Sequence, residues 1–235
     1  MEDKTAALKK NARIAGWWYL ITMVPSGYGL AYVRSKIIVE GNVAATINNI
    51  LIHEFLFRTG IVSQFITAIL FVLLASVLYR LLKQVNESQA KLMVAFVLVQ
   101  VPMIFLIETF NITSLMILKG NVLEALQPGQ KQDLATLFLN IHEYGTITLK
   151  VFWGLWLIPF GQLVYKSGFI PRLIGACLII GGIGWVLDTF TFVLFPGYYS
   201  FVFRYTVLSG AIGELPIILW LLIKGVRVQK SAIAS

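Results

Sequence analysis

Long apolar runs recur along this chain, and they constrain its fold more than any other feature. A bilayer core about 30 Å thick is crossed by roughly 20 residues of helix, and an open strand edge cannot be tolerated there. We therefore predict an all-α, polytopic membrane protein. The six predicted spans are Ile14–Val33, Gly60–Leu82, Lys91–Ile117, Gly145–Tyr165, Leu173–Phe195 and Phe201–Ile223.

The composition agrees with a membrane protein and argues against other classes. Hydrophobic residues make up 58% of the 235 residues and charged residues 13%, more apolar content than one soluble core of this length would bury. The excess of Lys and Arg (19) over Asp and Glu (11) suits loops at an anionic membrane surface, so we expect a lipid bilayer and no nucleic acid as partner. The single cysteine, Cys177, excludes an intrachain disulfide.

The segments between the spans also have recognisable patterns. Residues 42–58 carry apolar side chains at helical spacing, which predicts an amphipathic helix on the extracytoplasmic membrane surface. Residues 119–133 contain Pro128-Gly129 and predict a surface loop, from which Leu134–Asn140 leads back to the bilayer.

The basic residues predict the orientation. One side of the predicted membrane holds Lys4, Lys9, Lys10, Arg13, Arg80, Lys83, Lys91, Lys166, Arg172, Lys224, Arg227 and Lys230. The other side holds Arg34, Lys36, Arg58, Lys119, Lys131 and Arg204. Loops rich in Lys and Arg stay in the cytoplasm, so we expect both termini on the cytoplasmic side of a bacterial plasma membrane.

A weak internal repeat is visible within what we predict to be one transmembrane domain, residues 1–235. His53-Glu54 and His142-Glu143 each precede an apolar span that ends in a tyrosine and a basic residue. Both spans would run from outside to inside, so residues 14–118 and 134–224 are candidates for parallel repeats of three helices.

Three sequence blocks indicate a family. Residues 78–86 (LYRLLKQVN), residues 165–175 (YKSGFIPRLIG) and Ala15-Gly16 resemble the bacterial membrane family catalogued as domain of unknown function 4386. The resemblance covers nearly the whole chain and implies a multi-spanning membrane protein. It brings no activity and no catalytic residues.

Five ionisable residues lie inside or beside the apolar spans. A charged side chain costs several kcal/mol in a bilayer core and therefore usually has a partner, faces a cavity or marks a pathway. The five candidate binding residues are Glu108, Glu143, Lys150, Asp188 and Glu214.

Helical spacing places these residues on polar faces of their spans. Asp188 shares an arc of about 80° with Cys177, Gly181, Gly184 and Thr191, which predicts a close approach of a neighbouring helix. The similar depths of the five groups predict one polar pocket that opens outward. Four acids cannot all be ionised beside one lysine, so Lys150 should pair with one carboxylate while another is protonated or binds a cation.

Three functions fit this pattern. The first is binding or passage of a cation, a proton or a small polar solute through the predicted pocket, and a purely structural buried pair would give the same sequence pattern. The second is a metal-dependent membrane enzyme built on His53, Glu54, His142 and Glu143, although no H-E-x-x-H motif is present. The third is a non-catalytic interaction or sensor subunit. The sequence favours a non-enzyme and leaves the identity of any cofactor unknown.

Overall fold

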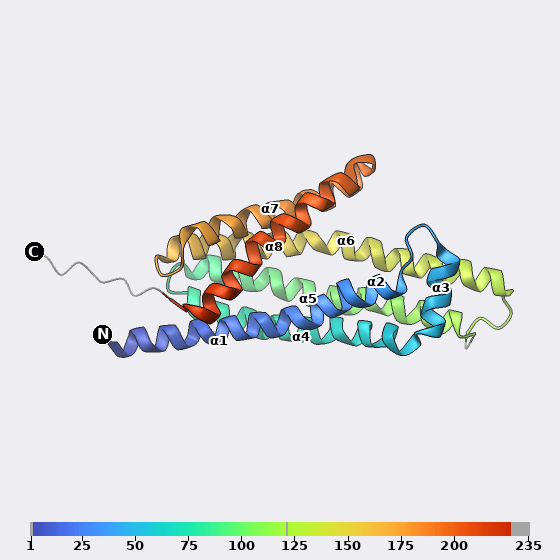
Figure 1. Cartoon of the computed structure of the whole chain (residues 1–235), viewed down its shortest axis with the longest axis horizontal. Helices are drawn as coiled ribbons and strands as arrows, with labels where there is room; N and C mark the ends of the chain where they lie inside the picture. The colour runs from blue at the N-terminus through green and yellow to red at the C-terminus, as the bar shows by residue number, and fades with distance from the viewer. Residues whose placement is uncertain (1, 121, 227–235) are drawn as a thin grey trace, which may run out of the picture. The chain divides into compact units, whose positions relative to one another are not determined.

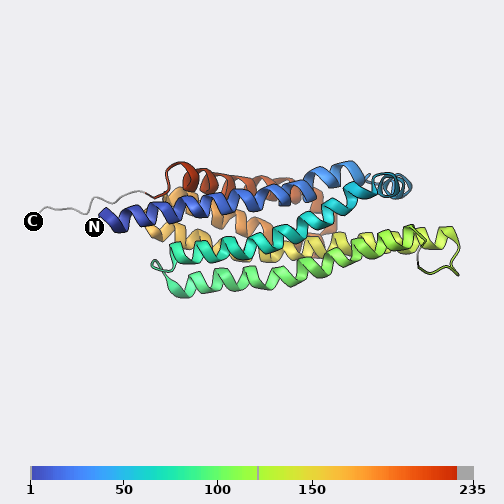
Figure 2. The same ribbon diagram turned by 90° about the horizontal axis from the view of Figure 1, so that it is seen from below.

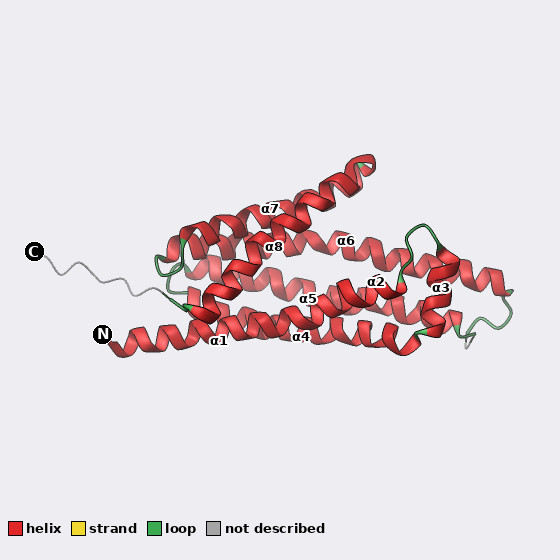
Figure 3. Ribbon diagram, viewed as in Figure 1, coloured by secondary structure: helices red, strands yellow, loops and turns green. Residues whose placement is uncertain are grey.

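A computed structural model describes residues 2–120 and 122–226, and within them it contains helices and loops but no strand (Figure 1 and Figure 3). The all-α prediction is confirmed for this part of the chain. The helices are α1 (Glu2–Gly27), the π-helix η1 (Tyr28–Val33), α2 (Arg34–Ile37), α3 (Val43–Ile52), α4 (Glu54–Leu82), α5 (Glu87–Leu118), α6 (Pro128–Ser167), α7 (Arg172–Leu194), the 3₁₀ helix η2 (Pro196–Tyr198) and α8 (Tyr199–Ile223).

Five helical segments are long and apolar enough to cross a membrane, which supports a multi-pass membrane protein. They are α4, α5, α6, α7 and the continuous segment of η2 and α8. The first predicted span, Ile14–Val33, is helical but is divided between α1 and η1. It therefore stays a prediction that this segment is the sixth span.

The helix boundaries differ from the predicted ones in two places. The predicted amphipathic helix at residues 42–58 is interrupted at His53, so that α3 ends at Ile52 and α4 begins at Glu54. The predicted loop at residues 119–133 is shorter, because α6 already begins at Pro128. Proline suits the first turn of a helix, where its missing N–H removes no hydrogen bond.

The helix α6 is much longer than the span that the sequence predicts. It contains 40 residues, whereas the predicted span Gly145–Tyr165 covers only its second half. At 1.5 Å per residue α6 is about 60 Å long, roughly twice the thickness of a hydrocarbon core. The segment Leu134–Asn140, which we predicted to lead from a surface loop back to the bilayer, is therefore part of the continuous helix α6.

The chain forms two compact units. Unit 1 comprises residues 1–21, 70–100 and 150–235, and unit 2 comprises residues 22–69 and 101–149. In unit 1, the turn between α4 and α5, the turn between α6 and α7, the start of α1 and the end of α8 lie at one end (Figure 1 and Figure 2). This arrangement agrees with the predicted alternation of loops, which assigns all four segments to the same basic side.

Glycines bring the helices of unit 1 into close contact. A Cβ atom added at Gly161 of α6 would lie 2.7 Å from the carbonyl oxygen of Gly175 in α7, and one added at Gly182 would lie 2.8 Å from the carbonyl oxygen of Gly154. On the other side of α7, a Cβ atom at Gly181 would lie 3.0 Å from the carbonyl oxygen of Ser209 in α8. Small residues thus let α7 pack against α6 and α8 at backbone distance.

The glycine of the Ala15-Gly16 block has the same role in α1. Ala15 is completely buried, and a Cβ atom added at Gly16 would lie 2.8 Å from the backbone nitrogen of Leu222 in α8. The block therefore marks the contact between α1 and α8.

Unit 2 has a hydrophobic core of its own. Its buried side chains come from η1, α2, α3, α4 and α5, namely Val33, Ile37, Ile50, Phe57, Ile61 and Leu115. The side chain of Asn42 accepts a hydrogen bond from the backbone N–H of Ala45 and caps the start of α3. A side-chain amide of α3, from Asn49, donates to the carbonyl oxygen of Ile37 at 3.2 Å and ties α3 to α2. The three-plus-three repeat stays a prediction.

We predict that Gly161→Ala destabilises the protein by about 1–3 kcal/mol, because the added methyl group overpacks the contact between α6 and α7. Thermal unfolding in detergent measures the effect. Gly129→Ala is the matched control on the same helix, because an added Cβ atom there meets nothing within 4 Å. Equal unfolding temperatures of the two variants would contradict the close contact.

Candidate functional site

The most deeply buried ionisable pair joins α6 and α7 in unit 1. The amine of Lys150 lies 2.8 Å from Oδ2 of Asp188, and both side chains are almost entirely excluded from solvent. The sequence prediction that Lys150 pairs with a carboxylate is confirmed. Two antiparallel helices joined by the short turn at residues 168–171 bring these groups together, because Lys150 and Asp188 lie nearly the same number of residues from the turn.

The helix α8 supplies two hydroxyl groups to this pair. The hydroxyl of Thr206 lies 3.0 Å from Oδ1 of Asp188, and the hydroxyl of Tyr199 lies 3.1 Å from the amine of Lys150. Each carboxylate oxygen of Asp188 therefore has its own hydrogen-bond donor. A buried charge pair is tolerated in an apolar interior when its remaining hydrogen-bonding capacity is satisfied in this way.

Aromatic rings enclose the lysine amine. The amine of Lys150 lies 4.4 Å from the centre of the Phe203 ring, and the rings of Tyr199 and Trp185 lie 5.6 and 5.7 Å away. Rings at these distances stabilise a cation through their negative faces. The result is a charged group held by one carboxylate, one phenol and three aromatic faces.

A second carboxylate contact in unit 1, which is partly buried, joins α1 and α8. The hydroxyl of Tyr19 donates to Oε2 of Glu214 at 2.7 Å, and Tyr19 is only 2% exposed. The Tyr19 ring packs near Trp156 and Phe160 of α6, with ring centres 6.1 and 6.3 Å away. Pro216 lies beside this contact, and its missing N–H leaves the carbonyl of the residue four positions earlier without its usual helical donor.

A histidine and a carboxylate meet in unit 2. Oε1 of Glu108 on α5 lies 3.1 Å from Nε2 of His142 on α6, and Oε2 accepts a hydrogen bond from the amide of Asn111 at 2.9 Å. Glu108 is buried, whereas the His142 side chain is 17% exposed. The pair thus joins α5 to α6 within unit 2, with the carboxylate buried and the imidazole partly exposed to solvent.

The last predicted acid lies at the surface of unit 2. Oε1 of Glu143 is 2.7 Å from a guanidinium nitrogen of Arg34, and both side chains are more than two-fifths exposed. A second surface network joins Glu54 to Arg58 at 2.7 Å and to Lys119 at 2.9 Å. Surface ion pairs of this kind contribute little to stability.

The structure distributes the five predicted residues over four contacts. Lys150 and Asp188 contact each other, while Glu214, Glu108 and Glu143 each contact a residue outside these five. Two surface grooves lie elsewhere, and none of the five residues lines either of them. Within unit 1, Glu214 thus has a different partner from the Lys150–Asp188 pair, and the common pocket of all five residues stays a prediction. Nothing in the sequence identifies Tyr19 or Arg34 as a partner of a buried or surface acid. The position of Tyr199 near the end of a predicted span is typical of a residue at the membrane interface.

The predicted metal ligands do not assemble into a site. His53 is exposed at the end of α3, and His142 faces Glu108. Across the two described ranges, no three His, Cys, Asp or Glu side chains lie close enough together to hold a metal ion.

Comparisons with known proteins agree on an uncharacterised family. The family model for a domain of unknown function (DUF4386) matches residues 14–225. An uncharacterized protein of Archaeoglobus fulgidus is 31% identical over 171 residues, which are 73% of this chain and 86% of that protein. No solved structure is significantly similar to the chain.

We predict that Asp188→Asn destabilises the protein by about 3–5 kcal/mol, because Lys150 then remains buried without a counter-charge. The double variant Lys150→Met/Asp188→Leu should recover most of this loss, since it removes both charges. Equilibrium unfolding in detergent measures all three proteins. Glu143→Gln is the control and should cost no more than about 1 kcal/mol, because its partner is exposed. An equal effect of Asp188→Asn and Glu143→Gln would refute the prediction.

Proposed function

Because the chain belongs to the family of the domain of unknown function DUF4386, which brings no assigned activity, we propose a function from its own residues: the protein binds protons at its buried carboxylates and passes them across the membrane. The observation that carries the proposal is the Lys150–Asp188 pair, which is buried at the contact of three apolar helices. Ionisable groups in such positions mark ion and proton pathways in membrane proteins.

The contacts favour a proton over the other solutes that the sequence allows. A metal cation needs several oxygen or nitrogen ligands around it, and the described acids are instead each engaged with one or two donors of the protein. A proton needs only one carboxylate oxygen or one imidazole nitrogen. Carboxylates that are already paired within the protein are therefore suited to proton binding.

Protonation of Asp188 would change its contacts directly. The neutral acid no longer attracts Lys150, so one added proton weakens the ion pair while the aromatic rings and the Tyr199 hydroxyl still hold the amine. The Glu108–His142 pair supports the same function independently, because a buried carboxylate there contacts a partly exposed imidazole, and histidine side chains commonly relay protons in proteins. We propose these two pairs as the proton-binding groups.

Proton flux into proteoliposomes tests the proposal. A pH-sensitive dye inside the vesicles reports acidification after valinomycin and a potassium gradient impose an inward-directed potential. Wild-type protein should acidify the vesicles faster than protein-free vesicles, and Asp188→Asn and Glu108→Gln should bring the rate toward that of protein-free vesicles. Glu143→Gln should keep the wild-type rate, because its carboxylate lies at the surface.

Two outcomes would contradict proton passage. One is a wild-type rate no faster than that of protein-free vesicles. The other is an undiminished rate in both Asp188→Asn and Glu108→Gln, which would assign the buried pairs a structural role in an interaction or sensor subunit. Monodisperse elution in detergent shows that a slow variant is still folded.

We further propose that the protein lies in the plasma membrane with both termini in the cytoplasm and with Ile14–Val33 as its sixth span. Arg80 at the end of α4 and Lys83 in the turn that follows make this connection basic, and basic connections of this kind remain in the cytoplasm. The start of α1 lies at the same end of unit 1 as this turn (Figure 2).

Cysteine labelling checks this topology in a Cys177→Ser background. We expect Lys10→Cys and Ser88→Cys to resist an impermeant maleimide applied to intact cells, and Glu40→Cys and Ala125→Cys to react with it. All four positions are exposed, so a lack of reaction reports the membrane rather than burial in the protein. Reaction of Lys10→Cys and Glu40→Cys from the same side would show that the first segment does not cross the membrane.

A further inference from the structure

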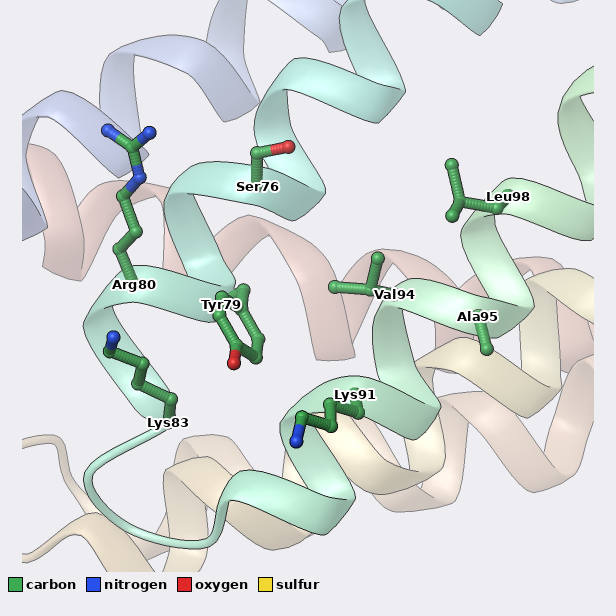
Figure 4. Close-up of a pocket in the computed structure, with 8 residues that line it drawn as sticks. All are labelled: Ser76, Tyr79, Arg80, Lys83, Lys91, Val94, Ala95 and Leu98. Carbon is green, nitrogen blue, oxygen red and sulfur yellow. The ribbon is translucent and has the colours of Figure 1, made fainter.

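An open groove lies between α4 and α5 in unit 1. It has a volume of about 550 Å³. The lining residues are Ser76, Tyr79 and Arg80 of α4, Lys83 directly after its end, and Lys91, Val94, Ala95 and Leu98 of α5 (Figure 4). On both helices the spacing of these residues follows one helical face. The groove is thus formed by two parallel stripes of side chains.

The chemistry of the groove changes along its length. The basic residues Lys83 and Lys91 lie near the turn that joins the two helices, on either side of Tyr79 (Figure 4). The apolar residues Val94, Ala95 and Leu98 lie farther along α5, and Leu98 is about 10 Å from Lys91 along the helix axis. The groove therefore has a charged end at the turn and an apolar end deeper in the membrane, which match the charged headgroup and the apolar acyl chains of a phospholipid.

The charged end keeps a net positive charge. Glu87 is an acidic neighbour of this end, and its carboxylate lies 3.1 Å from the amine of Lys91 and accepts a hydrogen bond from the hydroxyl of Tyr79. The amine of Lys83 lies 5.8 Å from the centre of the Tyr79 ring. Within residues 2–120 and 122–226, neither Lys83 nor Arg80 forms an ion pair with a carboxylate. Two exposed cations are therefore available to a ligand.

We propose that this groove binds an anionic phospholipid of the cytoplasmic leaflet. The phosphate would lie on Arg80, Lys83 and Lys91, and the upper part of an acyl chain would lie on Val94, Ala95 and Leu98. Basic pockets between transmembrane helices on the cytoplasmic side suit anionic headgroups. The apolar half distinguishes a lipid from free phosphate, which would leave that half uncovered. The inference rests on the proposed orientation but not on proton passage.

Native mass spectrometry of the detergent-solubilised full chain tests the proposal with phosphatidylglycerol and phosphatidylcholine of the same acyl chains. Wild-type protein should bind phosphatidylglycerol more tightly. Each basic residue near a membrane surface contributes about five-fold in affinity for an anionic lipid, so Arg80→Gln/Lys83→Gln/Lys91→Gln should weaken phosphatidylglycerol binding by more than about ten-fold. The control Lys9→Gln/Lys10→Gln/Lys224→Gln removes the same charge from exposed positions outside the groove and should change the affinity by less than about two-fold.

A second variant tests the apolar half. Ala95→Trp places a bulky side chain where the acyl chain would lie, and Ala95 is exposed, so the substitution leaves the helix packing intact. We expect it to weaken binding of phosphatidylglycerol. Equal binding of the two lipids by wild-type protein, or unchanged phosphatidylglycerol binding in the triple groove variant, would overturn the proposal. If inorganic phosphate competes with the lipid and Ala95→Trp has no effect, the groove is a phosphate site and the proposal of a lipid is refuted.

Discussion

The packing of α7 between α6 and α8 is the constraint on which the buried polar contacts of unit 1 depend. Gly154 and Gly161 of α6 leave no room for an additional methyl group, and Gly181 of α7 leaves little. Lipid tails are as apolar as the helices, so packing of small residues rather than the hydrophobic effect holds such helices together. Once the backbones are this close, Asp188 must meet its neighbours on both sides.

The close packing explains why the buried charges can be accommodated. Asp188 receives an amine from α6 and a hydroxyl from α8, and Glu214 receives a hydroxyl from α1. An unpaired carboxylate in these positions would cost far more than the pair does. The contacts of Asp188 join consecutive helices, whereas Tyr19 and Glu214 join the first helix to the last. Each acid has a defined partner, which is also what a proton-dependent change of contacts requires.

Two of the sequence blocks that indicate the family contain turns between helices rather than buried polar pairs. The block at residues 78–86 contains the basic turn between α4 and α5, and the block at residues 165–175 contains the turn between α6 and α7 with Gly168 at a φ of 71°. A positive φ is readily adopted by glycine, so the second turn can reverse the chain within a few residues. Basic residues flank both turns, while the glycines of α6 and α7 set the packing of these two helices.

The sequence alone determined that the chain is helical and apolar, where most of its long helices lie, and that the face of α7 with Gly181, Gly184 and Asp188 meets a neighbour. It also indicated that Lys150 needs a carboxylate. The tertiary structure alone decided that this carboxylate is Asp188, that Tyr19 reaches Glu214, and that His142 reaches Glu108. The physical reason is that the helical period fixes the direction of each side chain about its own axis, whereas the rotation and register of neighbouring helices depend on side-chain packing along their whole contact.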